Sequence, residues 1–159
     1  MVSFMICSTV PAVLNIQAGD VQESVSLKEL YGNGERILLV EDEESMLNFV
    51  KIVMSENGYT VFSASSAQEA VKIFKQENHD FSLVFSDVVL PDSSGVRLAE
   101  ELQSYKPELL CLLTSGYTDE KSQWALIQEK GYPFLQKPYT LYDLFKTIKD
   151  VLSTRLGLK

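Results

Sequence analysis

Apolar and polar residues form alternating blocks along the chain from residue 36 onward. Five short runs are rich in apolar and β-branched residues: RILLV (36–40), YTVFSA (59–64), SLVFS (82–86), LLCLLT (109–114) and PFLQ (133–136). Polar stretches of helical length separate them, and those at 67–74 and 141–152 carry apolar residues at the i, i+3, i+4, i+7 spacing of a helix. Five strand–helix units in succession predict an α/β fold, with a doubly wound parallel sheet covered by helices on both faces.

Residues 1–34 do not follow this alternation. Within them, VSFMICSTV (2–10) has the composition of a strand, VSLKEL (25–30) fits a short helical turn or a strand, and YGNGE (31–35) has the glycines and asparagine of a linker or turn. We therefore expect an N-terminal extension or linker over residues 1–34, one domain over 35–154, and a C-terminal tail over 155–159.

Caps and glycines mark several of the predicted element ends. Ser66 and Thr140 each precede a helical stretch and are expected to be N-caps. Gly58, Gly95 and Gly131 fall at joints between elements, where a positive φ is often required.

Polar side chains follow four of the five predicted strands. Glu41 and Asp42 follow the first strand, Asp87 the third, Ser115 the fourth and Lys137 the fifth. In parallel sheets, ligands bind beyond the carboxyl ends of the strands, so these residues are expected to lie together at one edge.

Three carboxylates converging on one edge repel each other, and a hard divalent cation would offset that repulsion. Mg²⁺ suits such a site because it binds a few carboxylate oxygens and keeps several waters. Asp87 could then attack a phosphoryl group, with Lys137 supplying positive charge and Ser115 a hydrogen bond. Taken singly, each signal has another interpretation: EDEE (41–44) suits the acidic first turn of a helix, Asp87 the start of a turn, and Lys137 an exposed surface position.

Together the motifs resemble the CheY-like receiver domain of response regulators, the phosphoacceptor module of two-component signalling. The matching segments are LLVEDEE, LVFSDVVLPDSSG, LLTSGYT and FLQKPY, and the resemblance covers about residues 35 to 154. It implies a flavodoxin-like (βα)5 fold with strand order 2-1-3-4-5. It also implies that Asp87 is the phosphoacceptor, assisted by Ser115 and Lys137.

The resemblance further implies which groups bind the metal and which residues change conformation on phosphorylation. Mg²⁺ would be held by Asp42, Asp87, the backbone carbonyl of Val89, and Glu41 directly or through water. Ser115 and Phe134 would be the switch residues, moving on phosphorylation and remodelling the surface of the fourth helix, fifth strand and fifth helix. The Lys137–Pro138 peptide bond is expected to be cis.

Several functions compete with a phosphoacceptor receiver. An aspartyl-nucleophile phosphatase of the haloacid-dehalogenase kind needs a second acid two residues after its nucleophile, where this chain has Val89. A degenerate, non-phosphorylated interaction module is disfavoured because all five motif positions are filled. The chain lacks the phosphoacceptor histidine and nucleotide-binding motifs of a kinase, so we do not expect kinase activity or enzymatic turnover from it alone.

Whether the receiver stands alone or is part of a longer protein, its parent protein, is a separate question. GNGERILLVEDE is similar to the linkers that precede the C-terminal receiver of hybrid sensor histidine kinases, and SFMICSTVPAV loosely resembles the last strand of a kinase ATP-binding domain. We favour a receiver that is part of, or derived from, such a kinase, with a stand-alone response regulator as the alternative. The expected partners are a histidine kinase as phosphodonor, a histidine phosphotransfer protein, and a second copy pairing through the switch surface. The chain ends soon after the last predicted helix, so no DNA-binding output domain is expected within it.

The composition argues against several other functions and locations. The net charge of −8 and pI of about 4.7 argue against non-specific nucleic-acid binding. No apolar run is long enough for a transmembrane helix, and the apolar N-terminus lacks the basic residues of a signal peptide. Cys7 and Cys111 have no metal or redox spacing, which favours two free thiols and a cytoplasmic protein.

Overall fold

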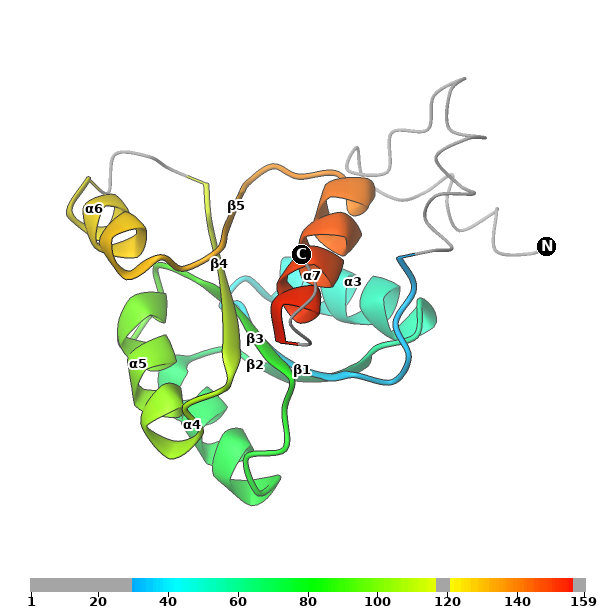
Figure 1. Cartoon of the computed structure of the whole chain (residues 1–159), viewed down its shortest axis with the longest axis horizontal. Helices are drawn as coiled ribbons and strands as arrows, with labels where there is room; N and C mark the ends of the chain where they lie inside the picture. The colour runs from blue at the N-terminus through cyan, green and yellow to red at the C-terminus, as the bar shows by residue number, and fades with distance from the viewer. Residues whose placement is uncertain (1–29, 117–120, 156–159) are drawn as a thin grey trace.

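A five-stranded parallel sheet forms the centre of the protein in the computed structural model, which describes residues 30–116 and 121–155 (Figure 1). The strands are β1 (Arg36–Val40), β2 (Thr60–Ala64), β3 (Leu83–Asp87), β4 (Leu110–Ser115) and β5 (Phe134–Gln136). Their order in the sheet is β2-β1-β3-β4-β5, and every neighbouring pair is parallel. This is the doubly wound order 2-1-3-4-5 expected from the sequence.

Helices cover both faces of the sheet. They are α3 (Glu44–Glu56), α4 (Ala67–Gln76), α5 (Gly95–Tyr105), α6 (Lys121–Lys130) and α7 (Leu141–Arg155). One hydrophobic cluster joins α3 and α7 to the sheet through residues such as Met54 and Phe145, and a second joins α4 and α5 through Phe74 and Leu102. Strand β3 is buried along its whole length, as its continuous apolar run predicts for a central strand.

The expected helix caps are present. Ser66 Oγ accepts a hydrogen bond from the Glu69 N–H at 3.1 Å. At the start of α7, the Asp143 N–H donates to Thr140 Oγ1 at 3.0 Å, and the Asp143 carboxylate lies 3.5 Å from the Thr140 N–H. These reciprocal contacts form a capping box with an aspartate in the place of the usual Glu or Gln.

Gly58 and Gly131 have positive φ angles of +99° and +74°, as expected at their joints. Gly95 does not, so the expectation of a positive φ is wrong there. The reason for a glycine is close packing, because a Cβ at Gly95 would lie 2.2 Å from the carbonyl oxygen of Asp87. The amino end of α5 therefore sits directly against the end of β3.

Residues 30–34 pack against the amino edge of the sheet. The N–H groups of Gly32 and Gly34 donate to the carbonyl oxygens of Asn57 and Gly58, at 2.8 and 2.7 Å. The hydroxyl of Tyr59 donates to the Leu30 carbonyl at 3.1 Å, and Leu30 packs on the α3–α7 cluster. The extension proposed for residues 1–34 thus has its last residues bound to the domain, while residues 1–29, which include Cys7, and residues 156–159 lie outside the described ranges.

Candidate functional site

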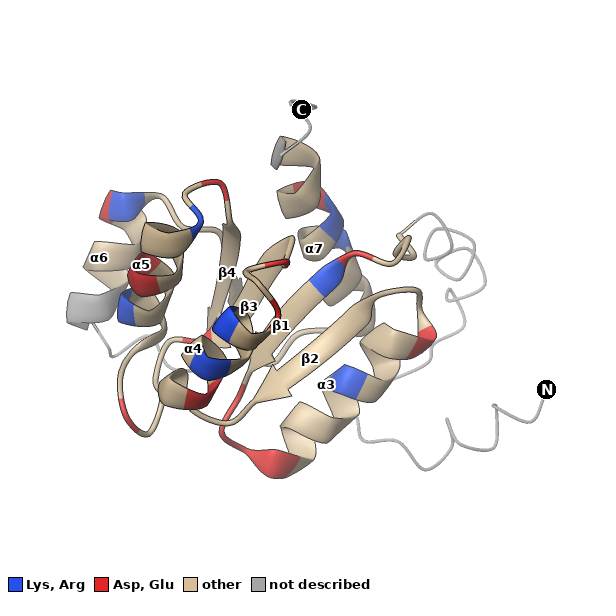
Figure 2. Cartoon of the chain, turned by 90° about the horizontal axis from the view of Figure 1, so that it is seen from below, with Lys and Arg blue, Asp and Glu red and all other residues tan. Residues whose placement is uncertain are grey.

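The polar residues at the ends of β3 and β4 and just after β1 and β5 lie at the carboxyl edge of the sheet, as parallel pairing requires. In Figure 2 the acidic segment that joins β1 to α3 is red and lies at this edge. One carboxylate oxygen from each of Glu41, Asp42 and Asp87 lies within 4.8 Å of the others. Glu41 and Asp87 are buried, with 5% and 7% of their surface exposed, whereas Asp42 is exposed.

Lys137 joins the two buried acids. Its Nζ lies 2.9 Å from Glu41 Oε1 and 2.9 Å from Asp87 Oδ1, and 21% of its side chain is exposed. The Lys137–Pro138 peptide bond is cis, the conformation expected from the sequence. One ammonium therefore offsets part of the charge of two carboxylates that come from separate strands.

The main chain fixes the positions of these groups. The Glu41 N–H donates to the Ala64 carbonyl at 3.0 Å, and the Lys137 N–H donates to the Ser115 carbonyl at 3.0 Å. The free carboxylate oxygen of Glu41, Oε2, accepts from the Glu43 N–H at 3.1 Å. Strand pairing thus places Glu41, Asp87 and Lys137 before any ligand arrives.

Burial changes the acidity of Asp87. It raises the pKa of the Asp87 carboxyl to about 7; the hydrogen bond and charge of Lys137 oppose this rise, and Glu41 adds to it. For Lys137, burial alone would lower the pKa, but the hydrogen bonds to Asp87 and Glu41 outweigh it and raise the pKa. Asp87 therefore exchanges its proton near neutral pH, while Lys137 keeps its charge.

Val89 follows Asp87 by two residues and Ser115 ends the neighbouring strand, whereas Phe134 begins β5 and pairs in register with Leu113 of β4. Val89 lies in the loop after β3 with 54% of its surface exposed, and Ser115 is a buried residue at the end of β4. Phe134 is half-buried against a small cluster that includes Val88 and Leu113, and its ring meets that of Trp124 at a centroid distance of 4.9 Å and an angle of 73°.

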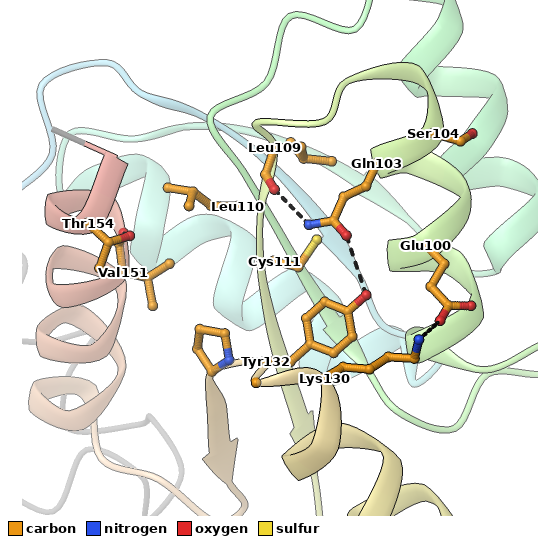
Figure 3. Close-up of a pocket in the computed structure, with 12 residues that line it drawn as sticks. Glu100, Gln103, Ser104, Leu109, Leu110, Cys111, Lys130, Tyr132, Val151 and Thr154 are labelled. Carbon is orange, nitrogen blue, oxygen red and sulfur yellow. Dashed lines mark hydrogen bonds and ion pairs between the residues drawn. The ribbon is translucent and has the colours of Figure 1, made fainter. Parts of the chain in front are cut away.

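A pocket lies at the opposite end of the sheet, where β4 begins (Figure 3). Its polar groups are largely paired with one another: Gln103 donates to the Leu109 carbonyl at 2.9 Å, the Tyr132 hydroxyl donates to Gln103 at 3.4 Å, and Lys130 pairs with Glu100. The thiol of Cys111, buried in this region, has its pKa raised to about 12 by burial. The one ion pair among the residues that line this region, Lys130–Glu100, has side chains 39% and 44% exposed, whereas two buried acids converge on one lysine at the carboxyl edge, which remains the candidate site.

The sequence motifs and the fold agree with comparisons to known proteins. The family model described as "Response regulator receiver domain" matches residues 37–149, more than half of the chain. The chain belongs to this family. It is a receiver domain of two-component signalling, with the (βα)5 architecture typical of receivers.

Two relatives and one solved structure illustrate the similarity. The receiver is 34% identical over 116 residues to the sensor kinase CckA of Brucella abortus (strain 2308), a match that covers 73% of this chain and 12% of CckA. It is 28% identical over 118 residues to the response regulator receiver protein CpdR of the same organism, covering 74% of this chain and 97% of CpdR. A receiver domain structure from Clostridium thermocellum superposes with a TM-score of 0.71 at 26% identity, covering 79% of this chain and 99% of that one. The chain thus spans about an eighth of one relative and nearly all of another.

Two features of the site were missed in the sequence. The motif LVFSDVVLPDSSG contains Asp92 but indicates no role for it, yet its carboxylate accepts hydrogen bonds from the first turn of α4. The pairing of Lys137 with Glu41 as well as Asp87 was also not predicted. The acidic residue just after Pro91 was the available signal for the first, but its partners lie about 25 residues away and only the fold brings them together.

Among the described residues, no helix combines the length and apolar character needed to cross a membrane.

Proposed function

We propose that Asp87 accepts a phosphoryl group from a phosphohistidine of a histidine kinase, in a Mg²⁺-dependent reaction. The observation that supports this most directly is the acidic cluster of Glu41, Asp42 and Asp87, with Lys137 Nζ 2.9 Å from two of the three. Asp87 is the central member, because β3 lies between β1 and β4 in the sheet.

In the reaction, one bond to phosphorus forms and another bond to phosphorus breaks. A carboxylate oxygen of Asp87 bonds to phosphorus as the P–N bond of the phosphohistidine breaks, and the released imidazole nitrogen takes up a proton from water. Lys137 holds positive charge beside the incoming phosphoryl oxygens, and Ser115, at the end of the neighbouring strand, donates a hydrogen bond to the group once it is attached. Positioning and charge supply most of the catalysis in such transfers.

The residues present fit a magnesium site. Three carboxylates with oxygens within 4.8 Å of one another provide hard ligands, and Asp42 leaves one side open to water. Glu41, Asp42, Asp87 and the carbonyl of Val89 would hold the ion. When bound, Mg²⁺ would offset negative charge on the transferring phosphoryl oxygens.

The first test is the intact mass of the protein after incubation with Mg²⁺ and acetyl phosphate. We expect a gain of one phosphoryl group in the wild-type protein, and none in Asp87→Asn or in the presence of EDTA. Asp80→Asn is the matched control, since the Asp80 side chain is 72% exposed and lies at the other end of the sheet. Equal phosphoryl uptake by Asp87→Asn and the wild-type protein would contradict the assignment.

Mg²⁺ affinity is expected to rise with pH up to about pH 7. Below that value a proton occupies the Asp87 carboxyl, whose pKa is raised to about 7, and it must leave before the cation binds. A proton competing at that pKa weakens the apparent affinity by about tenfold between about pH 8 and about pH 6. Calorimetry in two buffers of different ionisation enthalpy would measure both the affinity and the proton release. A pH-independent affinity, or the same pH dependence in Asp87→Asn, would rule this account out.

For the parent protein, we propose a hybrid histidine kinase, with a stand-alone regulator as the alternative. The 34% identity to the sensor kinase CckA supports the first, and the 97% coverage of CpdR is the observation that favours the second. A histidine phosphotransfer protein would be the next acceptor in a relay. An immunoblot of the native host with antibodies to residues 36–155 would decide, since a band near 17.9 kDa means a stand-alone protein and a much larger band means a hybrid kinase.

The proposed output surface consists of α6, β5 and α7. Phe134 and Trp124 contact each other on it, so a turn of Phe134 after phosphorylation would change the surroundings of the indole. Pairing of two copies through this surface is part of the same proposal.

A further inference from the structure

The loop that joins β3 to α5, residues 88–94, is folded back on itself. The Leu90 N–H donates to the Ser93 carbonyl at 3.2 Å, and the Gly95 N–H donates to the Val88 carbonyl at 2.7 Å. Val89 and Ser94 face each other as an isolated antiparallel bridge. This loop begins at the residue after Asp87, so its conformation decides where the Val89 main chain lies.

One side chain of the loop reaches a different helix. The carboxylate of Asp92 accepts from the Ala67 N–H through Oδ1 and from the Gln68 N–H through Oδ2, each at 2.9 Å. Ser66 caps the Glu69 N–H of the same helix, so three of the four N–H groups that open α4 are satisfied by side chains. The two backbone hydrogen bonds lower the pKa of Asp92, which keeps the carboxylate ionised.

The loop has two anchors of different kinds. Leu90 is buried in the cluster beneath α4 and α5, with 6% of its surface exposed, whereas the Val89 side chain is 54% exposed and contributes little packing. The Val89 carbonyl shares its peptide plane with the Leu90 N–H, which donates to the Ser93 carbonyl, so its orientation depends on where Ser93 lies. Asp92 adds a second, directional anchor three residues after Val89, and Pro91 between them has a fixed φ.

We propose that Asp92 is a positioning residue that, by clamping the loop to the first turn of α4, holds the Val89 carbonyl in the orientation required for the metal. This inference rests on the proposed function, because the Val89 carbonyl is a ligand only if the acidic cluster binds Mg²⁺. Asp92 touches neither the metal nor the phosphoryl group and acts through the main chain alone.

Asp92→Asn and Ser66→Ala form a matched pair. Both remove a cap from the same end of α4, but only the first releases the loop, because an asparagine presents an NH₂ group to one of the two N–H donors. Two properties are measured: the Mg²⁺ dissociation constant by calorimetry, and the hydrogen-exchange rates of the Leu90 and Gly95 amides in metal-free protein.

We expect Asp92→Asn to weaken Mg²⁺ binding by about tenfold, the low end of the effect of losing an outer contact of a metal site. We also expect faster exchange at Leu90 and Gly95, with neither change in Ser66→Ala. Equal effects in both variants, or wild-type affinity in Asp92→Asn, would overturn the inference while leaving the proposed function standing. If wild-type protein bound no Mg²⁺, the proposed function would fail and the positioning role with it.

Discussion

Replacing Lys137 with methionine is expected to lower the free energy of unfolding by about 3 kcal/mol near pH 8 in the presence of EDTA. That is the low end of the cost of removing one partner from a buried ion pair, because part of the Lys137 side chain is exposed. The variant leaves Glu41 and Asp87 buried with no ammonium between them. Urea denaturation at fixed protein concentration would measure the loss.

The loss should depend on pH, and its sign follows from Asp87. The folded pKa of this carboxyl is about 7, raised above its ordinary value, so folding favours the protonated form. The stability that this provides is complete at low pH and is lost as the pH rises through about 7. Lys137 opposes the rise, so without it the loss of stability extends to higher pH. The difference between variant and wild-type protein should therefore be smaller near about pH 5, where the Lys137–Glu41 pair alone is lost, than above about pH 7, where the pair with Asp87 is lost as well, and Mg²⁺ should reduce it.

Lys146→Met is the control for a lost lysine. Lys146 pairs with Asp150 one turn along α7, at 3.2 Å, with side chains 50% and 65% exposed. Such a pair contributes about 0.3 kcal/mol. If the two methionine variants lost the same stability, or if the Lys137→Met loss did not change with pH, the ion-pair account would be wrong.

The second large loss of stability is expected when Gly95 is replaced with alanine. The added Cβ would lie 2.2 Å from the Asp87 carbonyl oxygen and 3.0 Å from its carbonyl carbon. Both are main-chain atoms at the end of a buried strand and cannot rotate away, so the start of α5 or the end of β3 must shift. We expect a cost of about 3 kcal/mol, the top of the usual range for overpacking, and weaker Mg²⁺ binding because Asp87 itself is displaced.

The variant Gly116→Ala tests whether the loss of stability in Gly95→Ala comes from the contact of the added Cβ with the Asp87 main chain. A Cβ at Gly116 would have Lys137 Cβ as its nearest neighbour at 3.8 Å, an ordinary contact. We expect the free energy of unfolding to change by less than about 0.5 kcal/mol in this variant. A loss of stability in Gly95→Ala as small as that in Gly116→Ala would show that the short distance at Gly95 is relieved without strain.

The strands and the edge that carries the acids were predictable because both depend on local sequence. ILLV and LVF are apolar without alternation, which is typical of strands buried on both faces, and observed strand ends lie within one residue of the predicted ones. Once the strands are parallel, whatever follows them must gather at one edge. The convergence of Glu41, Asp42 and Asp87 follows from that topology alone.

The features that were not predicted depend on contacts between distant segments. Asp92 after Pro91 has the appearance of an ordinary turn residue until α4 is placed beside it. Gly95 was assigned to a joint for its conformational freedom, whereas its role is to let two main chains approach closely. Asn78 and His79 both have positive φ values, near +60°, in a turn whose sequence contains no glycine.

The position of Leu30 has a practical consequence. The chain enters the domain beside the turn between α3 and β2, at the amino edge of the sheet, while the acids and Lys137 lie at the carboxyl edge. A tag or fluorescent protein joined upstream of Leu30 would therefore approach the far pole of the domain and leave the acidic edge accessible. The two ends of the sheet can be engineered independently: the amino pole for attachment to other proteins, the carboxyl pole for chemistry.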